Sequence, residues 1–278
     1  MRFLYVAPRY HTNQVPIIRG LKRKGHEVCF LSQYAGKVED YSDLTPTVIG
    51  YSRIFLFFDR IYVALMKNRD AYAGDRKMKC GFPPIGKLKR AIRDSHGDVA
   101  VLRERSVYSI CAYLLCKKYK IPAILYNQSP LWEDCIKNDP AHRLMRLLTP
   151  TVRMTPVMGV QNGRKVKEPG AAFVPFVMEP EQKAEEKRWI KDGITHIFSI
   201  GKYEERKNHR MLVEIVEELS AVYNIHLTIA GERTTSAHQA YYDRLAAYIA
   251  DHGLQDKVTL LVNLNRQQVA EQYRKADL

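Results

Sequence analysis

The sequence lacks the motifs of several common enzyme classes. It has no HExxH segment of a zinc protease and no GxSxG turn of an α/β-hydrolase. Its five cysteines form no CxxC pair and show no metal-ligand spacing, so we expect reduced core thiols and no metal site. We expect no signal peptide either, because Met1 and Arg2 lead directly into a strand pattern.

Long hydrophobic runs are also absent. The longest apolar stretch, residues 54–66, includes Asp59 and Arg60, and it is too short and too charged to cross a bilayer. With 46% hydrophobic residues among 278, the chain has the composition of a globular protein large enough for two domains. These features together predict a cytoplasmic protein.

Acidic residues are too few to balance the basic ones in the first part of the chain. Residues 1–180 hold 30 Lys and Arg against 15 Asp and Glu, whereas residues 181–278 hold 14 against 15. This excess predicts an anionic partner: a phospholipid surface at the inner face of the membrane, a phosphorylated acceptor or nucleic acid. Solubility alone is the competing explanation. Nucleic acid ranks lowest, because the charge is scattered and no aromatic-basic motif is present.

The first part of the chain alternates strand and helix patterns. Buried-type strands are predicted at residues 3–8 and 27–33, joined by a helix that Asn13 caps and Gly25 ends. Such a βαβ unit begins a parallel sheet. The loop at residues 8–14 has no glycine, so its backbone could not approach a pyrophosphate closely, which argues against an NAD-binding Rossmann site.

Helices are predicted at residues 54–66 and 85–95. The second is basic and amphipathic, which fits either a helix packed on the core or one lying on an anionic membrane. The segment before it, residues 81–87, matches GxxxxGK. However, Leu88 replaces the Ser or Thr that holds Mg²⁺ and two prolines remove backbone donors, so we reject a phosphate-binding loop there.

Further elements continue the alternating pattern, with strands predicted at residues 98–104, 121–128, 153–158 and 171–176 and a helix at 107–118. Ligands bind beyond the carboxyl ends of parallel strands, which places Arg103, Asn127 and Gln128 at a candidate site. The charged stretch 180–192 has no apolar run and predicts a linker. We therefore expect one domain before residue 180 and a second after it.

The stretch from residue 195 to 208, THIFSIGKYEERKN, is the most informative in the chain. An apolar strand ends at Gly201, Lys202 and Lys207 follow, and an amphipathic helix is predicted at residues 211–219. Backbone N–H groups and the positive end of a helix favour a bound phosphate, and lysines neutralise it. The alternative is an exposed helix start with ordinary surface lysines. Two further strand–helix pairs are predicted at residues 226–232 and 241–253, and at 257–263 and 267–276.

The segments THIFSIGKYEERKN, HLTIAGE and VTLLVNLNRQQVAEQYRKADL together resemble the donor domain of family 4 glycosyltransferases, which are retaining enzymes of the GT-B fold. AAFVPF at residues 171–176 resembles the Val-Pro motif at which this family's chain leaves its first domain. The resemblance implies an α/β protein with two Rossmann-like parallel-sheet domains, the second incomplete. The family's next strand and its Glu-x7-Glu segment would follow Leu278, so the chain resembles the front two-thirds of such an enzyme.

This resemblance implies transfer of a sugar from a nucleoside-diphosphate donor to a cell-envelope glycan or lipid-linked acceptor. No obligatory metal is expected, and the sequence has no Asp-x-Asp motif. Lys202 and Lys207 would stabilise the leaving diphosphate, and Asn127 would lie near the reacting sugar. The implied donor-binding residues are Gly201, Lys202, Arg206, Lys207, Gly231, Glu232 and Leu264. The implied acceptor-side residues are Arg9, His11, Thr12, Asn13, Arg103, Asn127 and Gln128.

The sequence departs from the family pattern at three positions. Lys202 stands where arginine is usual, Asn127 lies where many members carry a histidine, and Val262 stands where glycine is usual. The family is thought to use a front-face route in which the leaving phosphate helps to deprotonate the acceptor, so transfer remains possible without that histidine. The alternative is a catalytically silent nucleotide- or glycan-binding protein or partner-dependent subunit, and a nucleic-acid-binding protein ranks below it.

Overall fold

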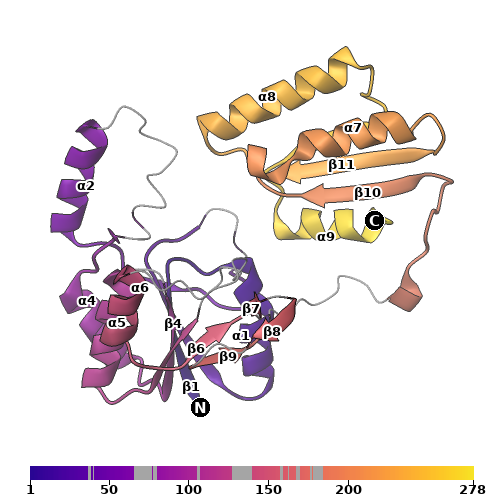
Figure 1. Cartoon of the computed structure of the whole chain (residues 1–278). Helices are drawn as coiled ribbons and strands as arrows, with labels where there is room; N and C mark the ends of the chain where they lie inside the picture. Colours follow the sequence, from indigo (N-terminus) through magenta and orange to yellow (C-terminus); the bar gives the residue numbers. More distant parts are fainter. Residues whose placement is uncertain are drawn as a thin grey trace. The chain divides into compact units, whose positions relative to one another are not determined.

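The computed structural model describes every residue except 37, 38, 40, 66–76, 78, 79, 105, 106, 127–139, 157, 158, 162, 167–169, 176 and 178–183. The chain divides into two compact units, Met1–Met178 and Glu179–Leu278. Each unit is built around its own parallel sheet (Figure 1), which confirms the predicted α/β class.

The sheet of the first unit has seven strands in the order β3-β2-β1-β4-β5-β6-β9, and all of its neighbouring strands are parallel. The strands are β1 (Arg2–Ala7), β2 (Glu27–Ser32), β3 (Thr47–Val48), β4 (Val99–Arg103), β5 (Ala123–Tyr126), β6 (Arg153–Thr155) and β9 (Ala171–Phe173). Side chains of β1 alternate between two cores: Leu4 and Val6 face one, and Tyr5 and Ala7 face the other. Burial on both sides explains why this strand is apolar from Phe3 onward.

Helices cover both faces of this sheet. They are α1 (Val15–Arg23) on one face, and α4 (Ile85–Asp94) and α5 (Val107–Lys118) on the other. The other helical elements described in this unit are η1 (Thr12–Gln14, a 3₁₀ helix), α2 (Arg53–Leu65) and α6 (Pro140–Leu148). Leu88 and Ile92 of α4 are fully buried and share a core with α5. The basic residues of α4 therefore form the solvated face of a core-packed helix, which decides between the two interpretations of residues 85–95.

Some local predictions for the first unit were wrong. The residue before α1 is Gln14, and it makes no side-chain capping bond; Asn13 lies inside η1 instead. The 3₁₀ turn is stabilised by a bond from the Gln14 N–H to the His11 carbonyl, so the chain enters the helix without a polar cap. The sequence also gave no indication of β3, of α6 or of an antiparallel hairpin of β7 (Gly159–Gln161) and β8 (Arg164–Val166).

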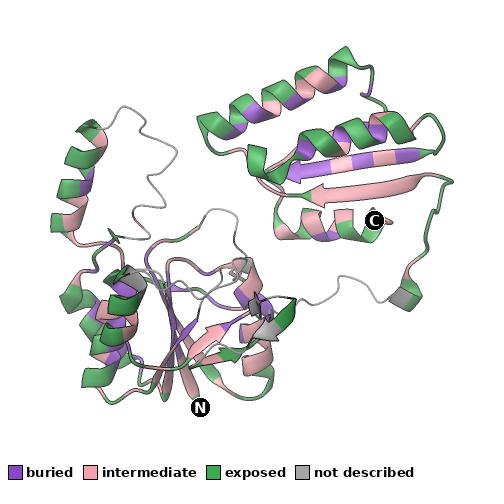
Figure 2. Ribbon diagram, in the orientation of Figure 1, coloured by how far each residue is buried: buried purple, intermediate pink, exposed green. Residues whose placement is uncertain are grey.

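The second unit has a sheet of three parallel strands, β10 (Thr195–Ile200), β11 (Ile225–Gly231) and β12 (Val258–Val262). Its helical elements are η2 (Ala184–Glu186), η3 (Glu205–Lys207), α7 (His209–Leu219), α8 (Ser236–Asp251) and α9 (Arg266–Lys275). Figure 1 shows α7 and α8 on one face of this sheet and α9 on the other. Figure 2 shows that the central strand, β11, is the most buried of the three.

Helix α8 begins five residues earlier than the predicted start at residue 241. Thr235 caps it, because its side chain accepts a hydrogen bond from the His238 N–H. The prediction relied on apolar periodicity, and the polar first turn of α8 does not show it. No helix in the described part of the chain is long and apolar enough to cross a membrane.

Candidate functional site

The strands of the second unit end side by side at one edge of its sheet. Ile200 of β10 lies opposite Ala230 of β11, and Gly231 lies opposite Val262 of β12. The residues that follow each strand are those predicted to bind the donor, so parallel register alone gathers three segments far apart in sequence. They are Gly201 and Lys202, then Glu232, then Leu264.

Tyr203 follows the end of β10 and contacts residues near the ends of β11 and β12. Its side chain is fully buried, and its hydroxyl lies 3.0 Å from the carbonyl oxygen of Ile229 and 2.8 Å from that of Leu261. A Cβ atom on Gly231 would lie 2.5 Å from the Tyr203 ring and 2.7 Å from the Gly201 carbonyl oxygen. Gly231 is therefore required for space, because Tyr203 and the first turn occupy the room that a side chain would need.

Both lysines predicted to bind the diphosphate, Lys202 and Lys207, lie at the turn that Gly201 begins. Lys202 Nζ lies 3.4 Å from Glu232 Oε2, across the ends of β10 and β11. A Cβ atom on Gly201 would lie 3.1 Å from Cδ of Lys207, so the stem of Lys207 covers this glycine. Arg206 instead points to Glu204, 2.5 Å away, and is largely exposed. The arrangement places two lysine side chains at one backbone turn, and such a concentration of positive charge favours an anion.

Glu232 is ionised at this edge. Burial by itself would raise the pKa of its carboxyl group. The hydrogen bond from Thr234 and the Lys202 ammonium outweigh that effect and hold the pKa below its ordinary value. A bound diphosphate would therefore compete with the Glu232 carboxylate for Lys202.

Helix α7 starts directly beneath the turn. Its first residue, His209, is buried, and its Nε2 lies 3.1 Å from the Lys202 carbonyl oxygen, to which it donates. Burial is the main reason why the pKa of His209 is lowered, so the ring is neutral near neutral pH. His209 thus fixes the backbone of Lys202 without adding charge. Periodicity and spacing gave no signal for this role or for that of Tyr203.

A third residue that the sequence did not indicate, Asn263, connects the turns after β11 and β12. Its Oδ1 accepts from the Arg233 N–H at 2.8 Å, and its Nδ2 donates to the Arg233 carbonyl oxygen at 3.3 Å. Asn263 has a φ of 53°, a left-handed conformation that asparagine tolerates better than most residues. The positive φ turns the chain sharply before Leu264, which is half-buried.

In the first unit, the predicted acceptor-side residues follow β1, end β4 or come after β5 in the sequence. His11 Nδ1 lies 3.1 Å from Asn13 Oδ1, and Arg9 forms an ion pair of 2.7 Å with Glu39. Burial and the nearby Arg9 guanidinium lower the pKa of His11. Arg103 is buried at the end of β4. Asn127 and Gln128 lie outside the described residues, and Thr12 is described only as part of η1.

Gln14 and Tyr126, which the sequence did not indicate, connect these groups. Gln14 accepts from the His11 N–H at 2.8 Å and donates through Nε2 to the Tyr126 hydroxyl. The guanidinium of Arg103 lies 5.4 Å from the centre of the Tyr126 ring. These contacts bring the ends of β1, β4 and β5 into one polar cluster.

Comparison with known proteins agrees with this geometry. Residues 181–278 match the family described as "Glycosyl transferases group 1". Over the whole chain the structure resembles a glycosyltransferase from Rickettsia africae ESF-5, with 13% identity, a TM-score of 0.63 and coverage of 99% of this chain and 71% of that one. The chain has the GT-B fold. No curated protein sequence matches it.

Two other GT-B-like structures contain nucleotides. A trehalose-6-phosphate structure from E. coli, bound with UDP-2-fluoro glucose, has 13% identity, a TM-score of 0.58 and coverage of 97% of this chain and 75% of that one. The S. aureus MnaA–UDP co-structure has 11% identity, a TM-score of 0.52 and coverage of 99% and 71%. At these identities the likeness establishes the fold, and function has to be argued from the site.

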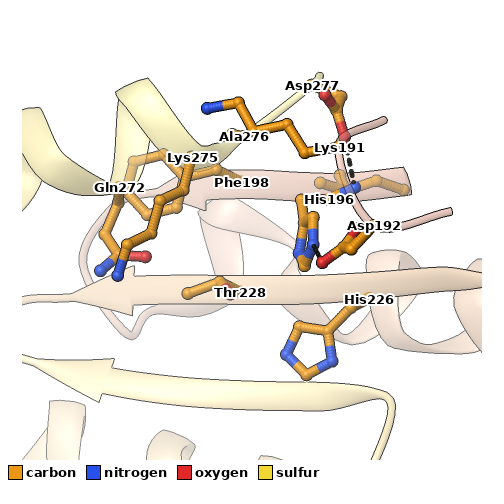
Figure 3. Close-up of a pocket in the computed structure, with 11 residues that line it drawn as sticks. Lys191, Asp192, His196, Phe198, His226, Thr228, Gln272, Lys275, Ala276 and Asp277 are labelled. Carbon is orange, nitrogen blue, oxygen red and sulfur yellow. Dashed lines mark hydrogen bonds and ion pairs between the residues drawn. The ribbon is translucent and has the colours of Figure 1, made fainter. Parts of the chain in front are cut away.

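A separate pocket of about 380 Å³ lies toward the other end of the sheet of the second unit (Figure 3). His196 and His226, the second residues of β10 and β11, face it. Its carboxylates already have partners: Asp192 lies 3.0 Å from the His196 ring, and Asp277 accepts from the Ile190 and His196 N–H groups. Among the described residues no cluster of His, Cys, Asp or Glu is placed to hold a metal ion.

Proposed function

We propose that the protein is a glycosyltransferase that uses a nucleoside-diphosphate sugar and transfers the sugar with retention. The observation that carries this proposal is the set of turns around Gly201, Lys202 and Lys207, inside the part of the chain that matches the group 1 family. The start of α7 and the two lysine ammonium groups favour a diphosphate there.

In this mechanism the second unit stabilises the leaving group. Negative charge grows on the diphosphate as its bond to the sugar breaks, and fixed cations stabilise it more in that state than in the ground state. Lys202 and Lys207 supply those cations, and the proposed mechanism requires no metal ion. The acceptor is a cell-envelope glycan or lipid-linked sugar, which agrees with the basic residues of the first unit and with a role in polysaccharide biosynthesis.

Nucleotide binding is the first test. The melting temperature and the heat of binding are measured with UDP, GDP and ADP for the wild type and for Lys202→Ala and Lys207→Ala. Lys191→Ala is the matched control, because Lys191 is exposed and lines the pocket at the other end of the sheet. We expect one nucleotide to stabilise the wild type and the control, and both site variants to bind it roughly tenfold or more weakly.

Turnover is the second test. Release of nucleotide from a sugar donor, with the anomeric configuration of the product followed by NMR, distinguishes retention from inversion. Nucleotide binding without turnover would instead favour the silent binding protein. Salt-sensitive binding of duplex DNA, with no effect of any nucleotide, would reverse the ranking.

A further inference from the structure

Helix α2 of the first unit presents its apolar side chains to solvent. Ile54, Phe57, Phe58, Ile61 and Leu65 are 73%, 60%, 62%, 42% and 77% exposed. Figure 2 shows the helix largely in the colour of exposed residues. Their spacing places all five on one stripe of the helix, and a helix of a globular protein normally turns such a stripe toward the core.

The opposite side of α2 faces the protein with half-buried Leu56 and Val63 and with one charged residue. Asp59 is 7% exposed, and its Oδ2 lies 3.6 Å from Lys77 Nζ. Leu56 and Val63 offer less apolar surface to the protein than the five exposed side chains of the stripe offer to solvent, so hydrophobic burial alone would favour the other rotation. The orientation is therefore imposed by the contacts that hold the base of the helix.

Those contacts are specific. The Ser52 N–H donates to the Phe82 carbonyl oxygen at 2.8 Å, and the Ser52 hydroxyl oxygen accepts from the Phe55 N–H at 3.1 Å. Tyr51 donates to Gln33 at 2.8 Å, and its ring fills the space beside Gly81, where a Cβ atom would lie 2.4 Å away. The start of α2 is thus fixed on the first unit with its stripe pointing outward.

An apolar cavity of about 400 Å³, widely open to solvent, lies along the stripe. It is lined by Phe55, Phe58, Asp59, Ile61, Tyr62, Leu65 and Cys80. Walls of this composition exclude strong hydrogen bonding to a ligand and favour hydrocarbon.

The charges around the stripe have one sign. Arg53 and Arg60 are exposed and lie seven residues apart, so both line the same edge of the stripe. Asp59, the only acidic residue in the sequence of α2, is buried. An apolar stripe with a basic edge is complementary to a lipid surface with anionic headgroups.

We propose that α2 docks the protein on an anionic lipid bilayer, with Phe57 and Phe58 inserted at the level of the headgroups and an acyl chain in the neighbouring cavity. A second copy is the less favourable occupant. Pairing two stripes would bring together the basic edges of both copies, and α2 has no exposed acidic side chain to compensate. The proposal does not depend on the transferase activity.

Vesicle co-sedimentation tests the proposal with the full chain. The vesicles contain phosphatidylcholine alone or phosphatidylcholine mixed with phosphatidylglycerol. We expect the wild type to pellet with the anionic vesicles. Phe57→Ser/Phe58→Ser should weaken the apparent affinity roughly tenfold or more, because the inserted apolar area is lost. Arg53→Gln/Arg60→Gln should retain residual binding but lose most of the preference for anionic vesicles.

The matched control is Val222→Ser/Tyr223→Ser in the second unit, whose side chains are 77% and 58% exposed. It removes similar apolar exposure and should bind vesicles as the wild type does. Equal melting temperatures of all variants verify their folding. The proposal is overturned if the wild type does not pellet at low salt, or if the phenylalanine variant pellets unchanged. A dimer in solution that only the phenylalanine variant dissociates, without vesicle binding, would assign the stripe to self-association instead.

Discussion

Replacing Gly231 by alanine tests whether Tyr203 and the glycine turns form one packed unit. The new methyl group would lie 2.5 Å from two ring carbons of Tyr203 and 2.7 Å from the Gly201 carbonyl oxygen, whereas ordinary contacts of a Cβ atom lie at 3.4–4 Å. One of these neighbours has to move by about 1 Å. Gly201 contributes a backbone atom, and Tyr203 is fully buried with its hydroxyl bonded to two carbonyl groups.

The cost follows from these contacts. Overpacking a rigid site costs about 1–3 kcal/mol, and moving Tyr203 away from its two acceptors adds about 1 kcal/mol. We therefore expect Gly231→Ala to lower the free energy of unfolding of the second unit by roughly 2–4 kcal/mol, and its melting temperature by at least about 8 °C. Nucleotide affinity should fall as well, because the turn at Lys202 moves with Tyr203.

The assay is calorimetry together with nucleotide titration. Gly20→Ala is the control, since Gly20 lies inside α1 with no atom within 4 Å of the added methyl group, and it should be neutral or slightly stabilising. Combining Gly231→Ala with Tyr203→Leu makes room for the methyl group, so the double variant should lose less stability than the two single losses added together. Strict additivity, or an unchanged melting temperature for Gly231→Ala, would refute this reasoning.

Three further predictions concern single contacts. Burial lowers the pKa of His209, so the unfolded chain binds a proton at this residue more readily than the folded chain does. The free energy of unfolding should therefore be highest above about pH 6.5 and should decline below that pH. Denaturant midpoints measured above and below about pH 6.5 should show a smaller decline in His209→Gln than in the wild type. Arg153→Ala removes the partner of half-buried Glu104, 2.7 Å away, and should cost about 3 kcal/mol of unfolding free energy by urea titration. Arg93→Ala, at an exposed pair, should leave the urea midpoint nearly unchanged. Asn263→Ala should weaken nucleotide binding a few-fold by calorimetry, because the bonds to Arg233 hold two turns together, with Asn224→Ala as the unaffected control.

The sequence by itself determined the order of the main elements and the end of the sheet at which the proposed donor site lies. Apolar runs and glycine-terminated strands are local signals, so β10, β11 and β12 were predicted within one or two residues. Parallel register then follows from alternation with helices, and it brings Gly201, Gly231 and Leu264 to one edge. Short or polar elements, such as β3 and the first turn of α8, carry too weak a local signal to be predicted.

Only the tertiary structure decided what holds the site together and which face of α2 is exposed. Tyr203 meets Leu261, 58 positions along the chain, and Gln14 meets Tyr126, 112 positions away; no spacing within a segment encodes such contacts. The apolar stripe of α2 would be assigned to the core by periodicity alone. Its exposure follows from the hydrogen bonds of Tyr51 to Gln33 and of Ser52 to Phe82, because these contacts fix the rotation of the start of the helix.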